Sequence, residues 1–195
     1  MNELENYQKY KWFYTSSGKL VVGGKSAVQN DELLKTVKSL KKDFIVIHTS
    51  SPGSPFSIIV SPINKVSKKD IEETSVFTAC FSQCWKLMSR KTSVDIFKSS
   101  QLYKGKDMKA GTWGVVGDVE EKPVHMSLAL TRQESVLRCV PEQSIKNKKD
   151  ILVRFKPGKI SKEEMVAKLA TELGEHFSQS ELLSALPSGG FSIIR

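Results

Sequence analysis

Short runs of aromatic and β-branched residues, separated by turn-forming segments, recur along most of the chain. Val, Ile, Phe and Tyr favour extended backbone, and clusters of Ser, Gly and Pro between the runs favour turns. The segment SSPGSP, with two prolines and a glycine, marks a loop between two such runs. The pattern predicts strands over residues 11–15, 19–22, 44–48, 56–60, 93–97, 112–116, 124–130 and 135–140.

Helical spacing of apolar residues appears in two places among these strands. Leu33, Leu34 and Val37 share one helical face and predict a helix over residues 29–40. We expect the longest helix to start at Ser67, whose hydroxyl caps it together with Asp70. Its core stripe would consist of Ile71, Phe77, Cys80, Phe81, Cys84 and Met88. Strands outnumber helices, so the pattern predicts an α+β fold, a mixed or antiparallel sheet with a long central helix.

The character of the chain changes after Pro141. The stretch EQSIKNKKD is polar and charged, which is typical of a hinge. Beyond it the pattern predicts a strand over 151–155, a PGK turn, and helices over 161–173 and 180–185. We therefore predict a main domain over residues 1–144 and a small C-terminal strand-helix segment over residues 145–195.

Composition narrows the class of protein. The 195 residues are 39% apolar, enough to bury a core. No apolar run approaches the ~20 residues that cross a membrane, and MNELENYQKYKW has no secretory h-region, so we expect a cytoplasmic protein without a membrane partner. The three cysteines show no metal-ligand spacing with the three histidines. We interpret them as core residues and expect neither a metal nor another cofactor.

Charge is unevenly distributed along this basic chain, whose net charge is +9. Basic residues concentrate in residues 86–109 and 141–162, whereas residues 163–185 are acidic. Such segregation is typical of a protein with one surface that meets a polyanion. A basic surplus also favours solubility, so charge alone leaves both interpretations open.

The segment VVGGKS resembles the end of a nucleotide-binding Walker A loop, but its spacing is wrong. The motif requires a glycine five residues before Gly24, and Lys19 stands there. What remains is Gly23 and Gly24 before a helix, with Ser26 as its N-cap and Lys25 alongside. Free N–H groups and the positive end of a helix dipole can hold one phosphate, such as one in a nucleic acid backbone. A Gly-Gly turn that ends a hairpin is the simpler alternative.

No catalytic constellation emerges from the sequence. His48 ends a predicted strand just before a loop with Pro52 and Gly53, a position where binding groups often lie. A general base requires an orienting partner, and none is evident. A histidine satisfied by hydrogen bonds at a strand end is therefore the preferred interpretation, and we expect no catalytic residues.

Several blocks of sequence resemble one family. WFYTSSGKLVVGGKSAVQND, with Trp12 on a strand, Gly23-Gly24-Lys25 at the turn and Asn30 opening the helix, resembles the first block of the NFACT-R domain. That domain is the RNA-binding-type module of the RqcH and NEMF proteins of ribosome-associated quality control. FIVIHTSSPGS, SVDIFKSSQLYKGKDMKAGTWGVVG and ESVLRCVPEQ resemble its later blocks, so the resemblance covers about residues 10–143.

The sequence also departs from this family. Many relatives carry an Asp in the loop after the strand histidine, whereas this loop has no carboxylate at residues 49–53. The N-terminal module and coiled coil of RqcH and NEMF have no counterpart in the printed sequence. The resemblance therefore implies a standalone NFACT-R protein with its own C-terminal extension, and tail synthesis is not carried over.

The resemblance implies an RNA-binding surface. Lysines of the expected loop over residues 101–110 can reach phosphates, and Tyr103 and Trp113 beside them can stack on an unpaired base. Trp113 as a core residue of a strand is the alternative. The candidate RNA-binding residues are Gly23, Gly24, Lys25, Asn30, His48, Lys98, Tyr103, Lys104, Lys106, Lys109 and Trp113.

We therefore expect a non-enzymatic protein that binds structured RNA, tRNA or rRNA, by shape and charge, with the ribosome as a further partner. One alternative is a protein adaptor that docks through the apolar side of the last long helix, formed by Met165, Val166, Leu169 and Leu173. The other is an enzyme, or enzyme subunit, of RNA modification with His48 in a pocket.

Overall fold

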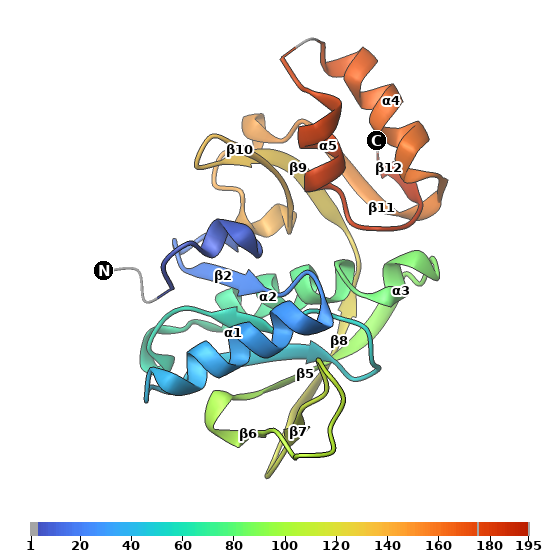
Figure 1. Cartoon of the computed structure of the whole chain (residues 1–195). Coiled ribbons are helices and arrows are strands. Elements are labelled where there is room, and N and C mark those ends of the chain that lie inside the picture. The colour runs from blue at the N-terminus through green and yellow to red at the C-terminus, as the bar shows by residue number, and fades with distance from the viewer. Residues whose placement is uncertain (1–3, 175, 195) are drawn as a thin grey trace.

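A computed structural model describes residues 4–174 and 176–194, which form three antiparallel sheets and five α-helices (Figure 1). The six-stranded sheet has the order β1 (Lys11–Tyr14), β2 (Leu20–Gly23), β4 (Ser57–Ile59), β3 (Ile45–Thr49), β5 (Lys91–Lys98) and β8 (Glu120–His125). The four-stranded sheet has the order β10 (Val136–Val140), β9 (Leu128–Gln133), β11 (Val153–Ile160) and β12 (Phe191–Ile194). Strands β6 (Leu102–Tyr103) and β7 (Gly114–Val115) form a separate pair. The predicted α+β class is confirmed.

The helices are α1 (Ala27–Ser39), α2 (Lys68–Cys80), α3 (Gln83–Lys86), α4 (Lys162–Leu173) and α5 (Gln179–Ala185). Strands β2, β4 and β3 of the six-stranded sheet are buried on both faces. Val21, Ile45 and Ile47 point to the α2 side, whereas the alternating Val22 and Val46 point to the α1 side. This alternation explains why the strands read as continuous apolar runs.

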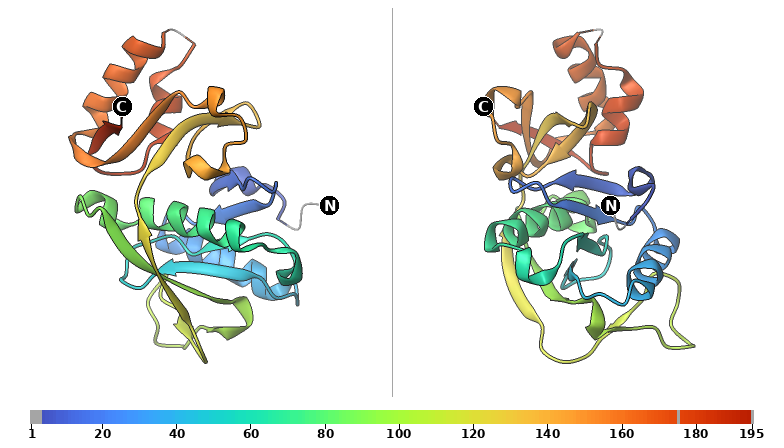
Figure 2. Two further views of the ribbon diagram at one scale, coloured as in Figure 1. Left: turned by 180° about the vertical axis from the view of Figure 1, so that it is seen from behind. Right: turned by 90° about the vertical axis from the view of Figure 1, so that its left-hand side faces the viewer.

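Helix α2 lies between the two larger sheets, as the views in Figure 2 show. Phe77 and Cys80 of α2 belong to one buried cluster that also includes Phe155 of β11 and Leu169 of α4. Helices α4 and α5 pack on the four-stranded sheet at the end of the molecule away from β6 and β7 (Figure 1). None of the helices in the described ranges is long and apolar enough to span a membrane.

The predicted long helix is shorter than its apolar stripe suggested. Ser67 and Asp70 form the predicted capping box, but α2 ends at Cys80. Ser82 then caps a new helix, α3, because its hydroxyl accepts the N–H of Cys84. Met88 has a φ of 55° and is 50% exposed, so the prediction that the stripe continues to Met88 is wrong. Cys80 is a buried, free thiol, consistent with its predicted place in the core.

The predicted strand over residues 124–130 is in fact parts of two strands. Strand β8 pairs with β5 in one sheet, and β9 pairs with β10 and β11 in the other. The chain crosses between the sheets at Met126 and Ser127. Because Met126 and Leu128 are both buried in the shared core, the apolar pattern does not reveal the break.

The C-terminal region contains a strand that the pattern did not predict. The predicted PGK turn lies inside β11, where the pairing with β12 shifts register between Pro157 and Ile160. Gly158 passes so close to β12 that a Cβ would lie 2.0 Å from the Ser192 hydroxyl. Strand β12 has only four residues, too few for a clear alternation of apolar and polar positions.

The four-stranded sheet combines strands from both sides of residue 144. Strand β11 pairs with β9 on one edge and with β12 on the other. The division into a main domain over residues 1–144 and an accessory segment over residues 145–195 stays a prediction. The pairing supports testing a division near Met126, where the chain enters the second sheet.

The apolar side of α4 faces the core. Met165, Val166 and Leu169 are buried, and Leu173 packs against them. The prediction that this side docks a partner protein is therefore wrong, because the four-stranded sheet and α5 already cover it.

A buried carboxylate anchors the β1–β2 turn to the start of α2. Asp70 is 1% exposed and accepts hydrogen bonds from the hydroxyls of Thr15 and Ser17, each at 2.6 Å. The N–H and hydroxyl of Ser67 donate to its second oxygen at 2.8 and 2.7 Å. Burial by itself raises the pKa of Asp70, but the hydrogen bonds outweigh it and lower the pKa to about 2.

Replacing this carboxylate should destabilise the protein in a pH-dependent way. We expect Asp70→Asn to lower the free energy of unfolding at neutral pH by about 2–4 kcal/mol, because the buried Thr15 hydroxyl, the Ser17 hydroxyl and the N-cap of α2 lose a charged acceptor. The folded pKa lies below the unfolded value of about 3.9, so this stabilisation is present above about pH 4 and is lost as the pH falls toward 2. Urea denaturation across this pH range measures it.

Glu72→Gln on the same helix provides the control. Glu72 forms an exposed ion pair with Lys122 at 3.1 Å, so its replacement should change stability by less than about 0.5 kcal/mol. Equal losses for the two variants would contradict the role assigned to Asp70.

Candidate nucleic-acid interface

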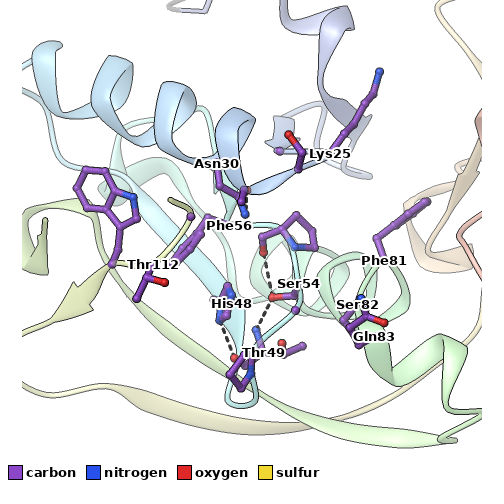
Figure 3. Close-up of a pocket in the computed structure, with 18 of the residues that line it drawn as sticks. Lys25, Asn30, His48, Thr49, Ser54, Phe56, Phe81, Ser82, Gln83 and Thr112 are labelled. Carbon is purple, nitrogen blue, oxygen red and sulfur yellow. Dashed lines mark hydrogen bonds between the residues drawn. The ribbon is translucent and has the colours of Figure 1, made fainter. Parts of the chain in front are cut away.

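Residues from several distant segments line a cleft of about 610 Å³, which we call the His48 cleft (Figure 3). Its walls come from the β2–α1 turn, the end of β3 with the loop after it, the α2–α3 junction, and the segment before β7. Five predicted site residues line it: Gly24, Lys25, Asn30, His48 and Trp113. These residues span almost ninety sequence positions, and only the tertiary fold brings them together.

The glycine turn is shaped by a close approach to α1. A Cβ on Gly24 would lie 2.3 Å from Asn30 Oδ1, so a larger residue does not fit. The buried Asn30 uses this oxygen to accept the N–H of Phe56 at 3.2 Å, which ties the turn to the start of β4. Gly23 lies in β2 itself. The turn is thereby held at the N-terminus of α1.

Some hydrogen-bonding groups at the N-terminus of α1 already have partners within the protein. Ser26 is the N-cap of α1 and accepts the N–H of Gln29 at 3.2 Å, as expected from the sequence. The N–H of Lys25 donates to Gln29 Oε1 at 3.0 Å, so this group is not free for a ligand. The ammonium of Lys25 is exposed, and its pKa is lowered by partial burial and by Arg138. Lys25 can therefore contact a ligand through its side-chain ammonium rather than through its backbone N–H.

His48 forms part of the cleft wall as a neutral ring. Its Nδ1–H donates to the Thr49 carbonyl at 2.7 Å, and its ring stacks on Phe56 at 4.3 Å (Figure 3). Burial lowers the pKa of His48, an effect that Thr49 and Asp95 only partly offset. No described carboxylate or nucleophile is hydrogen-bonded to it. The ring is therefore suited to stacking and to accepting a hydrogen bond at Nε2.

A carboxylate does reach the loop after β3, although the loop itself contains none. Asp95 of β5 lies opposite His48 in the sheet, and its Oδ1 accepts the hydroxyl of Ser50 at 2.6 Å. The loop is also fixed at its other end, where the N–H of Gln83 donates to the Gly53 carbonyl at 2.9 Å. The position of Asp95 was not predicted, because only strand register places it beside His48.

Lys104 makes several bonds within the loop between β6 and β7, which we call the lysine loop. Its ammonium lies 3.1 Å from Asp31 and donates to the carbonyls of Lys109 and Thr112 at 2.7 and 2.8 Å. Asp31 also accepts the indole N–H of Trp113 at 2.7 Å. Burial by itself raises the pKa of Asp31, but these bonds and the N–H of Gly111 outweigh it and lower the pKa. We therefore assign Lys104 to holding the loop, not to contacting phosphate.

The remaining predicted residues lie at the surface outside the His48 cleft. Lys98, Lys106 and Lys109 are exposed. Tyr103 is 46% exposed, and its ring covers Gly114, where a Cβ would lie 2.1 Å from the ring.

The half-buried Trp113 packs against the α1-side core and also lines the cleft, so the two interpretations of this residue are compatible.

Lys11 is a cleft residue that the sequence did not indicate. It starts β1, and its ammonium lies 4.4 Å from the ring centroid of Phe81. Burial and the neighbouring Lys162, Lys25 and Arg138 lower the pKa of Lys11 to about 8. Nothing local distinguishes this lysine from others, because its environment comes from elements far along the chain.

The cleft holds no recognisable metal centre. Across residues 4–174 and 176–194, no group of three His, Cys, Asp or Glu side chains is arranged to hold a metal ion. Its chemistry consists of cationic side chains, polar loop atoms and aromatic rings. Such a combination suits a ligand that carries both phosphates and flat bases.

Curated relatives share the whole length of this chain or part of it. The archaeal Rqc2 homolog aRqcH of Methanocaldococcus jannaschii is 26% identical over 203 aligned positions, which cover 99% of this chain and 30% of that protein. The ribosome quality control complex subunit NEMF of Homo sapiens is 25% identical over 80 positions, covering 40% of this chain and 7% of NEMF. The aRqcH alignment includes residues beyond 144, so the C-terminal region is shared with that relative.

One solved structure has a similar fold. The C-terminal part of the fibronectin/fibrinogen-binding protein from Streptococcus suis superimposes with a TM-score of 0.53 at 23% identity, over 61% of this chain and 46% of that one. The sequence pattern of the NFACT protein RNA binding domain matches residues 9–117, more than half of the chain. This segment contains the glycine turn, His48 and the lysine loop. The chain belongs to the NFACT protein RNA binding domain family.

Proposed function

We propose that this protein binds structured RNA, tRNA or rRNA, in ribosome-associated quality control in the cytoplasm. The observation that carries the proposal is the His48 cleft, where Lys25, His48 and Trp113 meet within the segment that matches the RNA binding domain family. The printed names of the relatives supply the quality-control context. Because the chain spans 30% of aRqcH, we do not extend that protein's whole activity to it.

The chemistry of the cleft supports RNA rather than a small metabolite. Among the described residues, Lys11, Lys25 and Lys86 line it together with one carboxylate, Asp95, so their summed formal charge is positive. His48 on Phe56 and the Trp113 ring offer flat surfaces for an unpaired base. Exposed Lys106 and Lys109 on the neighbouring loop add charge for the backbone. Recognition would then depend on shape and charge, with little base readout.

An enzyme of RNA modification is the second candidate, because His48 does line a ligand-sized cleft. Within the described residues, His48 is bonded to a backbone carbonyl and stacked on Phe56, with no acid to orient it as a general base. This arrangement favours binding over catalysis. Conversion of bound tRNA by the purified protein, lost in His48→Gln, would favour the enzyme.

Removing the exposed lysines should weaken RNA binding and its salt dependence. We expect the triple variant Lys25→Ala, Lys106→Ala, Lys109→Ala to bind tRNA at least about tenfold more weakly at low salt. Each lost phosphate contact should flatten the slope of log affinity against log salt by about 0.7–0.9. Titrations with tRNA, an rRNA fragment and duplex DNA across a salt series measure both effects.

A variant of equal charge provides the control. Lys65, Lys68 and Lys69 are exposed near the N-terminus of α2, whereas the cleft touches the far end of this helix, about 18 Å away. Their replacement by alanine should leave the affinity within about threefold of wild type. Equal weakening by the two triple variants would refute the assigned surface.

Two lysines of the same loop should behave differently. We expect Lys104→Ala to lower the free energy of unfolding by about 1–2 kcal/mol, because Asp31 and two carbonyls lose a half-buried partner. Lys106→Ala should change it by less than about 0.5 kcal/mol, since its side chain is exposed. Urea denaturation compares them, and unchanged stability of Lys104→Ala would show that its bonds do not hold the loop.

A further inference from the structure

A second cleft, of about 540 Å³, lies where the two larger sheets meet. We call it the junction cleft. Strand β1 forms one wall, and β10 with α5 forms the other. The side-chain amide of Gln133 in β9 joins the two sheets, because it accepts the N–H of Tyr14 at 2.8 Å and donates to the Tyr14 carbonyl at 2.9 Å. Neither the family match over residues 9–117 nor the predicted RNA-binding residues include the β10 side of this cleft.

Cations from four separate elements converge on the junction cleft. They are Lys11 of β1, Lys25 of the β2–α1 turn, Arg138 of β10 and Lys162 of α4. Within the described ranges, none of the four forms a salt bridge. The carboxylate that lines this cleft, Glu181, already pairs with Arg132 at 3.2 Å and caps α5 through Ser178. Among the residues that the structure describes, the cluster therefore has no counter-charge of its own.

Arg138 is the most unusual member of this cluster. Its guanidinium carbon lies 4.0 Å from the ring centroid of Trp12, and its Nε is buried without a hydrogen-bond partner. Burial lowers the pKa of Arg138 to about 10. A buried donor without a partner is costly in a folded protein, and an oxyanion is the ligand that a guanidinium binds best. The geometry holds Arg138 ready for an anion.

The two clefts adjoin one another. Lys11, Lys25 and Ser188 line both, so the cationic cluster lies at one end of the His48 cleft. A nucleic acid strand has phosphates at regular short intervals, so a strand in the His48 cleft would place another phosphate within reach of this cluster.

We propose that the junction cleft binds a phosphate group, held by Lys11, Arg138 and Lys162, and that this phosphate belongs to the RNA strand that occupies the His48 cleft. The source of the phosphate rests on the proposed function, whereas the anion site itself does not. The C-terminal region would then complete the binding surface of the RNA binding domain, since β10 and α4 supply two of the three cations.

Sulfate, which imitates a phosphate group, tests the anion site without RNA. In ¹H–¹⁵N NMR titrations of the full chain at constant ionic strength, sulfate should shift the Arg138 Nε–H and Trp12 indole signals, while chloride should not. We expect Arg138→Gln and Lys11→Met to weaken sulfate binding at least about tenfold. Lys11→Met keeps an aliphatic side chain on Phe81 and should therefore fold. It tests the site even if Arg138→Gln misfolds. Exposed Lys168→Met on α4 should leave sulfate binding unchanged.

The pH dependence gives a second readout. The groups that face Lys11 are Lys25, Arg138 and Lys162, with Glu181 on α5 and the buried Cys139 on β10. In the protein without sulfate, the pKa of Lys11 is about 8. Its ammonium therefore loses its charge as the pH rises from about 7 to about 9, and the affinity for sulfate should fall. The charge of sulfate stays constant over this range. Lys11→Met should reduce this change, and any remaining change comes from Lys162 and Lys25, whose pKa values burial also lowers.

The possible outcomes test the anion site and the source of its phosphate separately. If Arg138→Gln and Lys11→Met weaken both sulfate and tRNA binding, the phosphate belongs to RNA. If they weaken sulfate binding alone, the RNA source is overturned and the site serves a free phosphate compound. If wild-type protein binds sulfate but no RNA, the proposed function fails and the anion site stands. If sulfate shifts neither signal, the anion site is refuted, whatever the RNA result.

Discussion

Helix α2 lies between two sheets, so a side chain that it buries has to be either apolar or hydrogen-bonded. Phe77, Ala79 and Cys80 satisfy the first condition. Thr74 and Thr78 satisfy the second, because their hydroxyls donate to carbonyls one helical turn earlier. This helix joins the two larger sheets, since the six-stranded sheet packs on one side of it and the four-stranded sheet on the other.

The Asp70 carboxylate fixes the direction in which this helix starts. It joins the α2 N-terminus to Thr15 and Ser17 in the turn between β1 and β2. At the other end of this hairpin, Lys11 pairs with Gly23, next to the Gly23-Gly24 turn. The buried network therefore positions both clefts, although it lies apart from them.

Both clefts form at junctions between elements rather than within one element. In the His48 cleft, Asn30 links α1 to the start of β4, and Asp31 holds Trp113 and Lys104 against the same helix. In the junction cleft, Arg138 of one sheet stacks on Trp12 of the other. Lysines that are neighbours in sequence accordingly differ in role, since Lys104 is bonded within the protein and Lys106 is exposed to solvent.

The sequence by itself determined the elements with strong local patterns and caps, such as α1 after Ser26 and α2 after Ser67. The sequence also contains the Gly23-Gly24 turn and His48, on which the family resemblance depends. Tertiary structure alone decided the break between β8 and β9, the register that places Asp95 beside His48, and the meeting of Lys11 with Arg138. The physical reason is range: caps and periodicity depend on residues within a few positions, whereas strand register and charge clustering depend on partners that lie tens of residues away, or more than a hundred for Lys11 and Arg138.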